Sequence, residues 1–134
     1  MSRVVQQSVT FNAPAARLFA IYMNARQHAA ATGAPVVVSR KPGSRFSAFG
    51  GEVAGRTLAV VPGRLIVQAW RGRRWPKTDA DSLLILTFTE TSRGGRVDLV
   101  HANVPAHDYA GVKTGWTRYY WQPWKAYLRK SGRK

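Results

Sequence analysis

The clearest alternation of hydrophobic and polar positions lies between residues 83 and 90. Leu84, Leu86 and Phe88 fall on one face of an extended chain, and the residues between them fall on the other. The segment is rich in β-branched and aromatic residues, which fit a half-buried, pleated surface. The pattern therefore predicts a β-strand with one buried face. A similar alternation predicts a first strand over residues 3–11.

Turn signals divide the middle of the chain into further strands. Gly50-Gly51 tolerates positive φ at both central turn positions, and Pro62-Gly63 and Arg93-Gly94-Gly95 mark two more turns. The predicted strands are 46–49, 52–61, 65–70, 83–90 and 97–104, with a long exposed connection over 71–81. Strands joined by turns this short pair antiparallel, so we predict a sheet of hairpin-linked neighbours.

Two short helices are predicted after the first strand. Asn12 offers a helix N-cap, Pro14 suits the first turn, and Leu18, Phe19 and Tyr22 form an apolar stripe, which together predict a helix over 13–22. Residues 24–31 are expected to continue as a second short turn. The glycine, proline and basic residues of 32–44 predict a loop, which we expect to be the most mobile part of the chain.

A long C-terminal helix is predicted to begin near residues 107–108 and to carry an aromatic face. At helical spacing this face consists of Trp116, Tyr120, Trp124, Tyr127 and Leu128. Each buried aromatic side chain removes roughly 150–250 Å² from water, so a broad apolar surface must lie beneath the helix. Pro123 interrupts the pattern, because it lacks a backbone N–H and would clash with the carbonyl of Tyr119. We expect a kink there, or packing tight enough to absorb the cost.

Together these elements predict one α+β domain over residues 1–134 with a helix-grip arrangement. About six antiparallel strands would wrap around the long C-terminal helix, with the two short helices after the first strand. No apolar run approaches the roughly 18–20 residues that span a membrane, and the N-terminus lacks the pattern of a signal peptide. There is no cysteine, hence no disulfide framework. The expected location is the cytoplasm.

The formal net charge of +15 favours acidic partners such as nucleic acid, anionic lipid or an acidic protein surface. The basic residues are spread from Arg3 to Lys134 without a dense block. The positive net charge results as much from the small number of acidic residues, six, as from the 21 basic residues. Trp75 is flanked by four basic residues, Arg71, Arg73, Arg74 and Lys77. Basic residues around an aromatic side chain can bind single-stranded nucleic acid. A solvated loop anchored by the tryptophan is the favoured interpretation. Nucleic-acid binding is therefore expected to be weak and non-specific.

No catalytic constellation is visible, and we expect a non-enzymatic protein without cofactor or metal. The six carboxylates form no recognisable pair, and His28, His101 and His107 lack the spacing of metal ligands. His101 shares a strand face with Val97 and Leu99, where it could orient a polar ligand or act as a base. A hydrogen-bonded histidine without a chemical role is the favoured alternative.

Several motifs resemble the activator of heat shock protein 90 ATPase family, and they follow one another in the family's order along nearly the whole chain. They are Gly43-Ser44-Arg45-Phe46-Ser47-Ala48-Phe49-Gly50-Gly51, Val53-Ala54-Gly55, Ile66-Val67-Gln68-Ala69-Trp70-Arg71, Trp75-Pro76, Val104-Pro105 and Gly115-Trp116-Thr117-Arg118-Tyr119-Tyr120-Trp121. The family belongs to the START-like (SRPBCC) superfamily, so the resemblance implies a helix-grip fold with an internal hydrophobic cavity. Ser44 departs from the family, which often has a second glycine there.

Two functions are expected from these observations. The first is binding of an apolar or amphipathic small molecule in a cavity between the sheet and the C-terminal helix. Its candidate lining residues are Phe46, Phe49, Trp70, Trp75, His101, Trp116 and Tyr120, for which core packing is the alternative role. The second is a chaperone cofactor or stress-response interaction module, whose basic surface would contact a heat shock protein 90-type chaperone.

Overall fold

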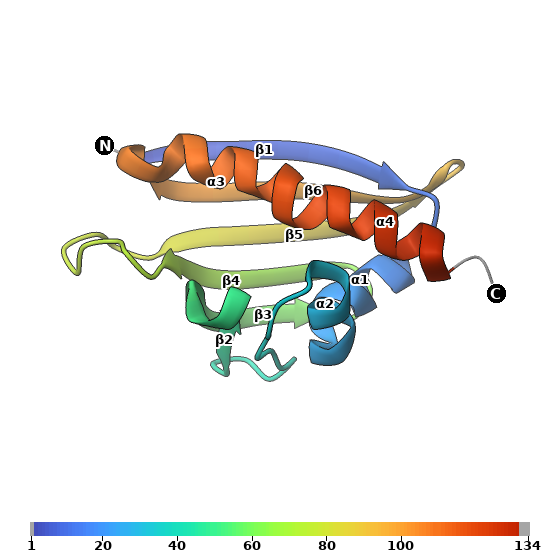
Figure 1. Cartoon of the computed structure of the whole chain (residues 1–134), viewed down its shortest axis with the longest axis horizontal. Helices are drawn as coiled ribbons and strands as arrows, with labels where there is room; N and C mark the ends of the chain where they lie inside the picture. Colours follow the sequence, from blue (N-terminus) through green and yellow to red (C-terminus); the bar gives the residue numbers. More distant parts are fainter. Residues whose placement is uncertain (1, 132–134) are drawn as a thin grey trace.

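Six antiparallel strands form a single sheet in the computed structural model, which describes residues 2–131 (Figure 1). In chain order the strands are β1 (Ser2–Phe11), β2 (Arg45–Ala48), β3 (Val53–Val61), β4 (Leu65–Gly72), β5 (Ser82–Thr91) and β6 (Gly94–Pro105). Their spatial order is β1-β6-β5-β4-β3-β2. Strands β2 to β6 are therefore joined as successive hairpins, and β1 pairs with β6 and forms the opposite edge of the sheet. The predicted hairpin-linked sheet is confirmed.

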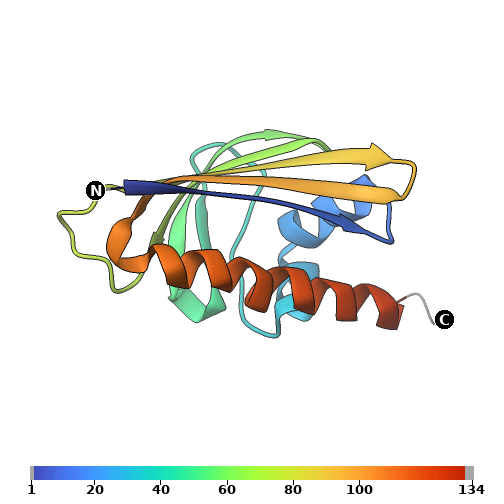
Figure 2. The same ribbon diagram turned by 90° about the horizontal axis from the view of Figure 1, so that it is seen from above.

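The helices pack on one face of this sheet. α1 (Ala15–Met23) and α2 (Ala25–Thr32) follow β1, and a short 3₁₀ turn (Ala106–Asp108) leads from β6 into the C-terminal helix. That helix consists of α3 (Tyr109–Gly115), a π-helical turn (Trp116–Trp121) and α4 (Gln122–Ser131). It crosses the sheet diagonally (Figure 1), and α1 and α2 lie on the same side of the sheet (Figure 2). The α+β helix-grip arrangement expected from the sequence is therefore confirmed.

The start of α1 differs from the prediction. Asn12 is not the N-cap, and the helix begins at Ala15, with Pro14 in extended conformation as the cap residue. The Pro14 carbonyl accepts hydrogen bonds from the backbone N–H groups of Arg17 and Leu18. The Ala15 N–H donates instead to Oε1 of Glu90 on β5, at 2.8 Å. The sheet thus satisfies a helix donor that sequence reasoning had assigned to a local side chain.

The C-terminal helix buries Trp116, Tyr120 and Trp124 of the predicted face, and Trp121 in addition. The Gln122 N–H donates to the carbonyl of Thr117, five residues back, so the helix widens into a π turn just before Pro123. A π turn holds one residue more than an α turn. Tyr120 and Trp121 are therefore both buried, whereas Tyr127 and Leu128 are only partly covered. The interruption expected at Pro123 exists, and its form is a π turn.

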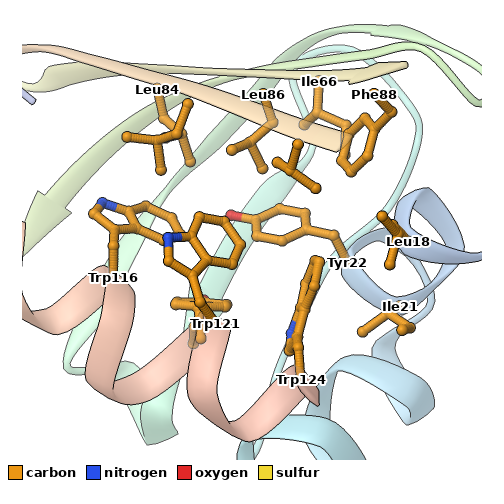
Figure 3. Packing of buried hydrophobic residues seen from close by; sticks show 14 of the residues in the cluster. Leu18, Ile21, Tyr22, Ile66, Leu84, Leu86, Phe88, Trp116, Trp121 and Trp124 are labelled. Atoms are coloured by element: carbon orange, nitrogen blue, oxygen red, sulfur yellow. The ribbon is translucent and has the colours of Figure 1, made fainter. Parts of the chain in front are cut away.

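The core lies between the sheet and these helices, and aromatic rings fill most of it. Inward-facing side chains of β4 and β5, including Ile66, Leu84 and Leu86, meet Trp116 and Trp121 of the helix (Figure 3). All five tryptophans form one continuous row, with centroid separations of 5.6, 6.5, 5.5 and 5.4 Å along Trp75, Trp70, Trp116, Trp121 and Trp124. The row joins the loop after β4, the sheet and the C-terminal helix.

Candidate functional site: an aromatic pocket beside the C-terminal helix

A pocket of about 520 Å³ lies between the first half of the C-terminal helix and the β3–β4 part of the sheet. On the sheet side it is lined by Phe49, Glu52, Val53, Trp70 and Gly72. On the helix side it is lined by Asp108, Gly111, Val112, Gly115, Trp116, Tyr119 and Tyr120. The lining is predominantly apolar and aromatic, as in most small-molecule sites.

Glycines keep the pocket open. Gly111 and Gly115 are four residues apart in the helix, so both face the sheet side at this point. A Cβ atom on Gly115 would meet only the ring of Tyr119, at 3.5 Å, an ordinary van der Waals distance. The helix therefore has space at Gly115 that no side chain of residues 2–131 fills. This pair of glycines, just before the aromatic face, is the sequence feature that marks the pocket.

Four of the seven predicted site residues line the pocket, namely Phe49, Trp70, Trp116 and Tyr120. The other three lie behind its wall. Phe46 is fully buried in the core, Trp75 packs against Trp70, and His101 lies edge-on to Trp70 with ring centroids 4.7 Å apart. Phe49 has φ of 54°, a left-handed conformation uncommon for a bulky residue, and its ring lies nearly perpendicular to that of Tyr120, with ring centroids 5.4 Å apart.

A buried hydrogen-bond chain holds Trp116. Its indole Nε1–H donates to Nδ1 of His101 at 3.1 Å, so the opposite nitrogen of a neutral His101 carries the proton. That Nε2–H donates to Oγ of Ser82 at 2.8 Å, and the Ser82 hydroxyl donates to the Trp70 carbonyl at 2.5 Å. Burial lowers the pKa of His101 to about 4, which keeps it neutral near pH 7. The favoured interpretation of His101 as a hydrogen-bonded sheet residue agrees with this geometry.

A second histidine holds Tyr120. His28 of α2 donates from Nδ1 to the Tyr22 carbonyl at 2.8 Å, which leaves its Nε2 to accept from the Tyr120 hydroxyl at 3.0 Å. Burial lowers the pKa of His28 to about 4, opposed by the bond to the Tyr22 carbonyl, and burial also raises the pKa of Tyr120. The Tyr22 hydroxyl donates to Oε1 of Gln68, at 2.7 Å. Sequence reasoning missed His28, since nothing local pairs residues 92 positions apart.

Two carboxylates stand at the pocket. Asp108 accepts a hydrogen bond from Nε1 of Trp75 at 2.8 Å, which ties the loop after β4 to the start of the helix. Glu52 follows the Gly50-Gly51 turn and is exposed. Trp70 adds a further feature, because its buried Nε1 has no hydrogen-bond partner within residues 2–131. The pocket wall thus contains both acceptors and an unpaired donor.

The basic loop after β4 is held by its own side chains. Arg71 forms an ion pair with Asp81 at 2.7 Å and also donates to the carbonyls of Pro76 and Asp79. Arg73, Arg74 and Lys77 are exposed, and Trp75 is buried beneath them. This agrees with the favoured interpretation of a solvated loop anchored by Trp75.

Within residues 2–131, no three His, Asp or Glu side chains lie close enough together to hold a metal ion. Over the same residues, every helix is too short or too polar to cross a membrane.

Comparison with known proteins supports the resemblance seen in the sequence. A family model described as "Activator of Hsp90 ATPase homolog 1-like protein" matches residues 12–129. An uncharacterized protein of Schizosaccharomyces pombe is 30% identical over 121 residues, which are 90% of this chain and 36% of that protein. The human activator of 90 kDa heat shock protein ATPase homolog 1 is 26% identical over 113 residues, 84% of this chain and 33% of that protein. This chain thus spans about a third of the length of these curated relatives.

Solved structures show the same fold. An HSP90 activator from Plasmodium falciparum superposes with a TM-score of 0.83 at 23% identity, covering 93% of this chain and 95% of that one. A protein from Mesorhizobium loti superposes with a TM-score of 0.81 at 21% identity, covering 96% and 98%. Since the family model spans most of the sequence, this chain belongs to the family of Activator of Hsp90 ATPase homolog 1-like proteins.

Proposed function

We propose that this domain binds an apolar small molecule in the pocket between its C-terminal helix and the sheet. The observation that carries the proposal is a pocket of about 520 Å³ whose wall includes five aromatic rings and which has free space at Gly115 of the helix. This volume falls within the range of roughly 300–1,000 Å³ typical of small-molecule sites. Binding would be driven by removing the ligand's apolar surface, and that of the rings, from water.

The wall is organised before any ligand arrives. Trp116 and Tyr120 are each tied to a buried histidine, and those histidines are anchored on other elements of the fold. A side chain already fixed in one rotamer loses little further entropy when a ligand packs against it. The hydrogen bonds therefore support a binding role for these rings in addition to core packing.

Native mass spectrometry of freshly purified protein, compared with the denatured mass, tests the proposal. The expected result is a discrete stoichiometric excess that disappears on denaturation. Gly115→Leu should abolish this excess, because the new side chain would fill the pocket. Thr114→Leu is the matched control, since Thr114 is exposed on the same helix and does not line the pocket. An excess that Gly115→Leu retains would place the ligand elsewhere.

A second candidate is a chaperone cofactor that acts through its basic surface. It is supported by the names of the curated relatives and by the net charge of +15. The test measures the ATPase rate of a heat shock protein 90-type chaperone with and without this protein across a salt series. Stimulation that falls with salt is expected, and no change in rate at any salt concentration would exclude this function.

A double charge reversal, Arg73→Glu with Arg74→Glu, tests whether the loop after β4 contacts the chaperone. The matched control is Arg64→Glu with Arg93→Glu, which changes the net charge equally at two exposed turns. If the loop forms the contact, only the first pair should lower stimulation. Equal losses would indicate a contribution from total charge.

A further inference from the structure

The charge of the pocket is opposite to that of the protein. The chain has 21 Lys and Arg residues against six Asp and Glu, yet both charged residues that line the pocket are acids, Glu52 and Asp108. With this composition, a pocket lined by randomly chosen charged residues of the chain would be expected to carry positive charge. The site therefore presents negative charge to a ligand although the molecule as a whole is strongly positive.

Asp108 is placed for this role by its neighbours. It occupies the N-cap position of α3, where an aspartate side chain ordinarily accepts a hydrogen bond from the helix, but here it makes no capping bond. Its Oδ2 instead accepts from Trp75. A Cβ atom on Gly111 would come within 2.9 Å of Asp108 Oδ1, so glycine gives this carboxylate its space against the helix. The carboxylate is thus held at the pocket wall.

The aromatic rings of the pocket are suited to the same charge. Ring faces attract cations through their quadrupole, most strongly for tryptophan. Within residues 2–131, the protein's own cations stack on Tyr119, Tyr109, Phe19 and Tyr127, and none stacks on Trp70, Trp116, Tyr120 or Phe49. The guanidinium carbon of Arg118 lies 5.7 Å from the ring centroid of Tyr119, so a cation of the protein already stacks on that ring.

We propose that the pocket selects small organic cations that carry an apolar body, such as aryl-substituted tertiary or quaternary amines, over neutral and anionic molecules of the same shape. The cationic centre would lie near Glu52 and Asp108, and the apolar body would pack against Trp70 and Trp116. Most of the protein's positive charge acts from outside, where screening shortens its reach to roughly 8 Å at physiological salt. The two carboxylates act at contact distance. This inference rests on the proposed small-molecule function.

Isothermal titration calorimetry with three matched probes tests the preference. The probes are a benzyl-substituted choline, its neutral isostere with carbon in place of the charged nitrogen, and benzylsulfonate. We expect the cation to bind between about two-fold and about thirty-fold more tightly than the isostere, the range that two exposed ion pairs supply, and the sulfonate to bind most weakly.

Two neutralising variants locate the effect. Glu52→Gln and Asp108→Asn should each bring the cation-to-isostere affinity ratio closer to one, with the amide oxygen at 108 still able to accept from Trp75. Asp98→Asn is the control, because it changes the net charge equally but lies on β6 in a pair with Arg96, away from the pocket. It should leave the ratio unchanged.

The outcomes separate this inference from the function on which it rests. Equal binding of cation and isostere by the unmodified protein would overturn the charge preference and leave the apolar pocket standing. A ratio that neither Glu52→Gln nor Asp108→Asn changes would overturn the role assigned to the two carboxylates. If none of the three probes binds and native mass spectrometry shows no retained ligand, both proposals fall.

Discussion

Two buried histidines determine how firmly single residues of the pocket wall are held. In its neutral form each uses one ring nitrogen as donor and the other as acceptor, so protonation changes the bond at the accepting nitrogen. A protonated His101 would turn a second N–H towards the N–H of Trp116. A protonated His28 could still donate to the Tyr120 hydroxyl oxygen, but it would carry a buried positive charge. Acidification should therefore destabilise the packing of the pocket wall around these two histidines.

The free energy of unfolding should fall as the pH is lowered from about 6.5 towards about 4. In both histidines the folded-state pKa is about 4 against an ordinary 6.5, so the unfolded chain binds more protons across this window. By linkage, stability is fully present above pH 6.5, and each histidine removes on the order of 2 kcal/mol by pH 5. Urea unfolding at a series of pH values measures this.

A His101→Asn variant provides the comparison for that series. It should be less stable at neutral pH, because Trp116 or Ser82 loses its partner, but it should lose less stability on acidification. Unfolding free energies that stay constant between pH 7 and 5 in the unmodified protein would contradict the assignment.

Replacing the two helix glycines at the pocket, Gly111 and Gly115, should have unequal effects on stability. Gly115→Ala should stabilise the protein by roughly 0.5–1 kcal/mol, since alanine is the better helix former and its Cβ has room. Gly111→Ala should gain less or destabilise, because its Cβ would come within 2.9 Å of the Asp108 carboxylate. Thermal unfolding of the two variants side by side checks the order, and the reverse order would be incompatible with the described geometry.

At the scale of elements, the C-terminal helix shows how a periodic pattern can predict an element and still miss its buried face. The spacing of Trp116, Tyr120 and Trp124 predicted the helix correctly. The predicted face did not include Trp121, yet Trp121 is only 3% exposed and its indole N–H donates to Oε1 of Gln7 on β1 at 2.7 Å. Pro123 signalled an interruption, but whether it becomes a kink or a π turn depends on contacts with the sheet.

Alanine substitutions can distinguish the π-turn register from a regular α-helix. Trp121→Ala should cost about 3–5 kcal/mol, the usual range for a fully buried tryptophan. Tyr127→Ala should cost about 1 kcal/mol, because Tyr127 is only partly buried. Chemical denaturation of both variants measures the difference. A larger loss for Tyr127→Ala would favour the α-helical face predicted from spacing.

The strands were predictable because alternation and turn glycines are local signals. The cap of α1 was not, because Glu90, which takes the helix N–H of Ala15, lies 75 residues away. The same difference between local signals and long-range contacts explains which residues of the candidate site were predictable. Aromatic type drew attention to Phe49, Trp70, Trp116 and Tyr120, whereas the carboxylates and glycines between them acquire their place only when the helix lies against β4.

At the scale of the whole molecule, the net charge of +15 predicts association with polyanions whatever their sequence. The expected dissociation constant for a random duplex is about 10⁻⁴–10⁻⁶ M at physiological salt. Fluorescence anisotropy with two unrelated duplexes should give similar affinities that fall steeply as salt increases. A strong preference for one sequence, or an affinity that salt does not change, would point to a specific nucleic-acid site instead.

The row of five tryptophans makes the protein its own optical reporter. Neighbouring indoles lie between 5.4 and 6.5 Å apart, close enough for excitation absorbed by one ring to migrate along the row before emission. A quencher in contact with Trp70 or Trp116 would then dim the emission of the whole row. One unlabelled emission spectrum would report both occupancy of the pocket and docking of the helix.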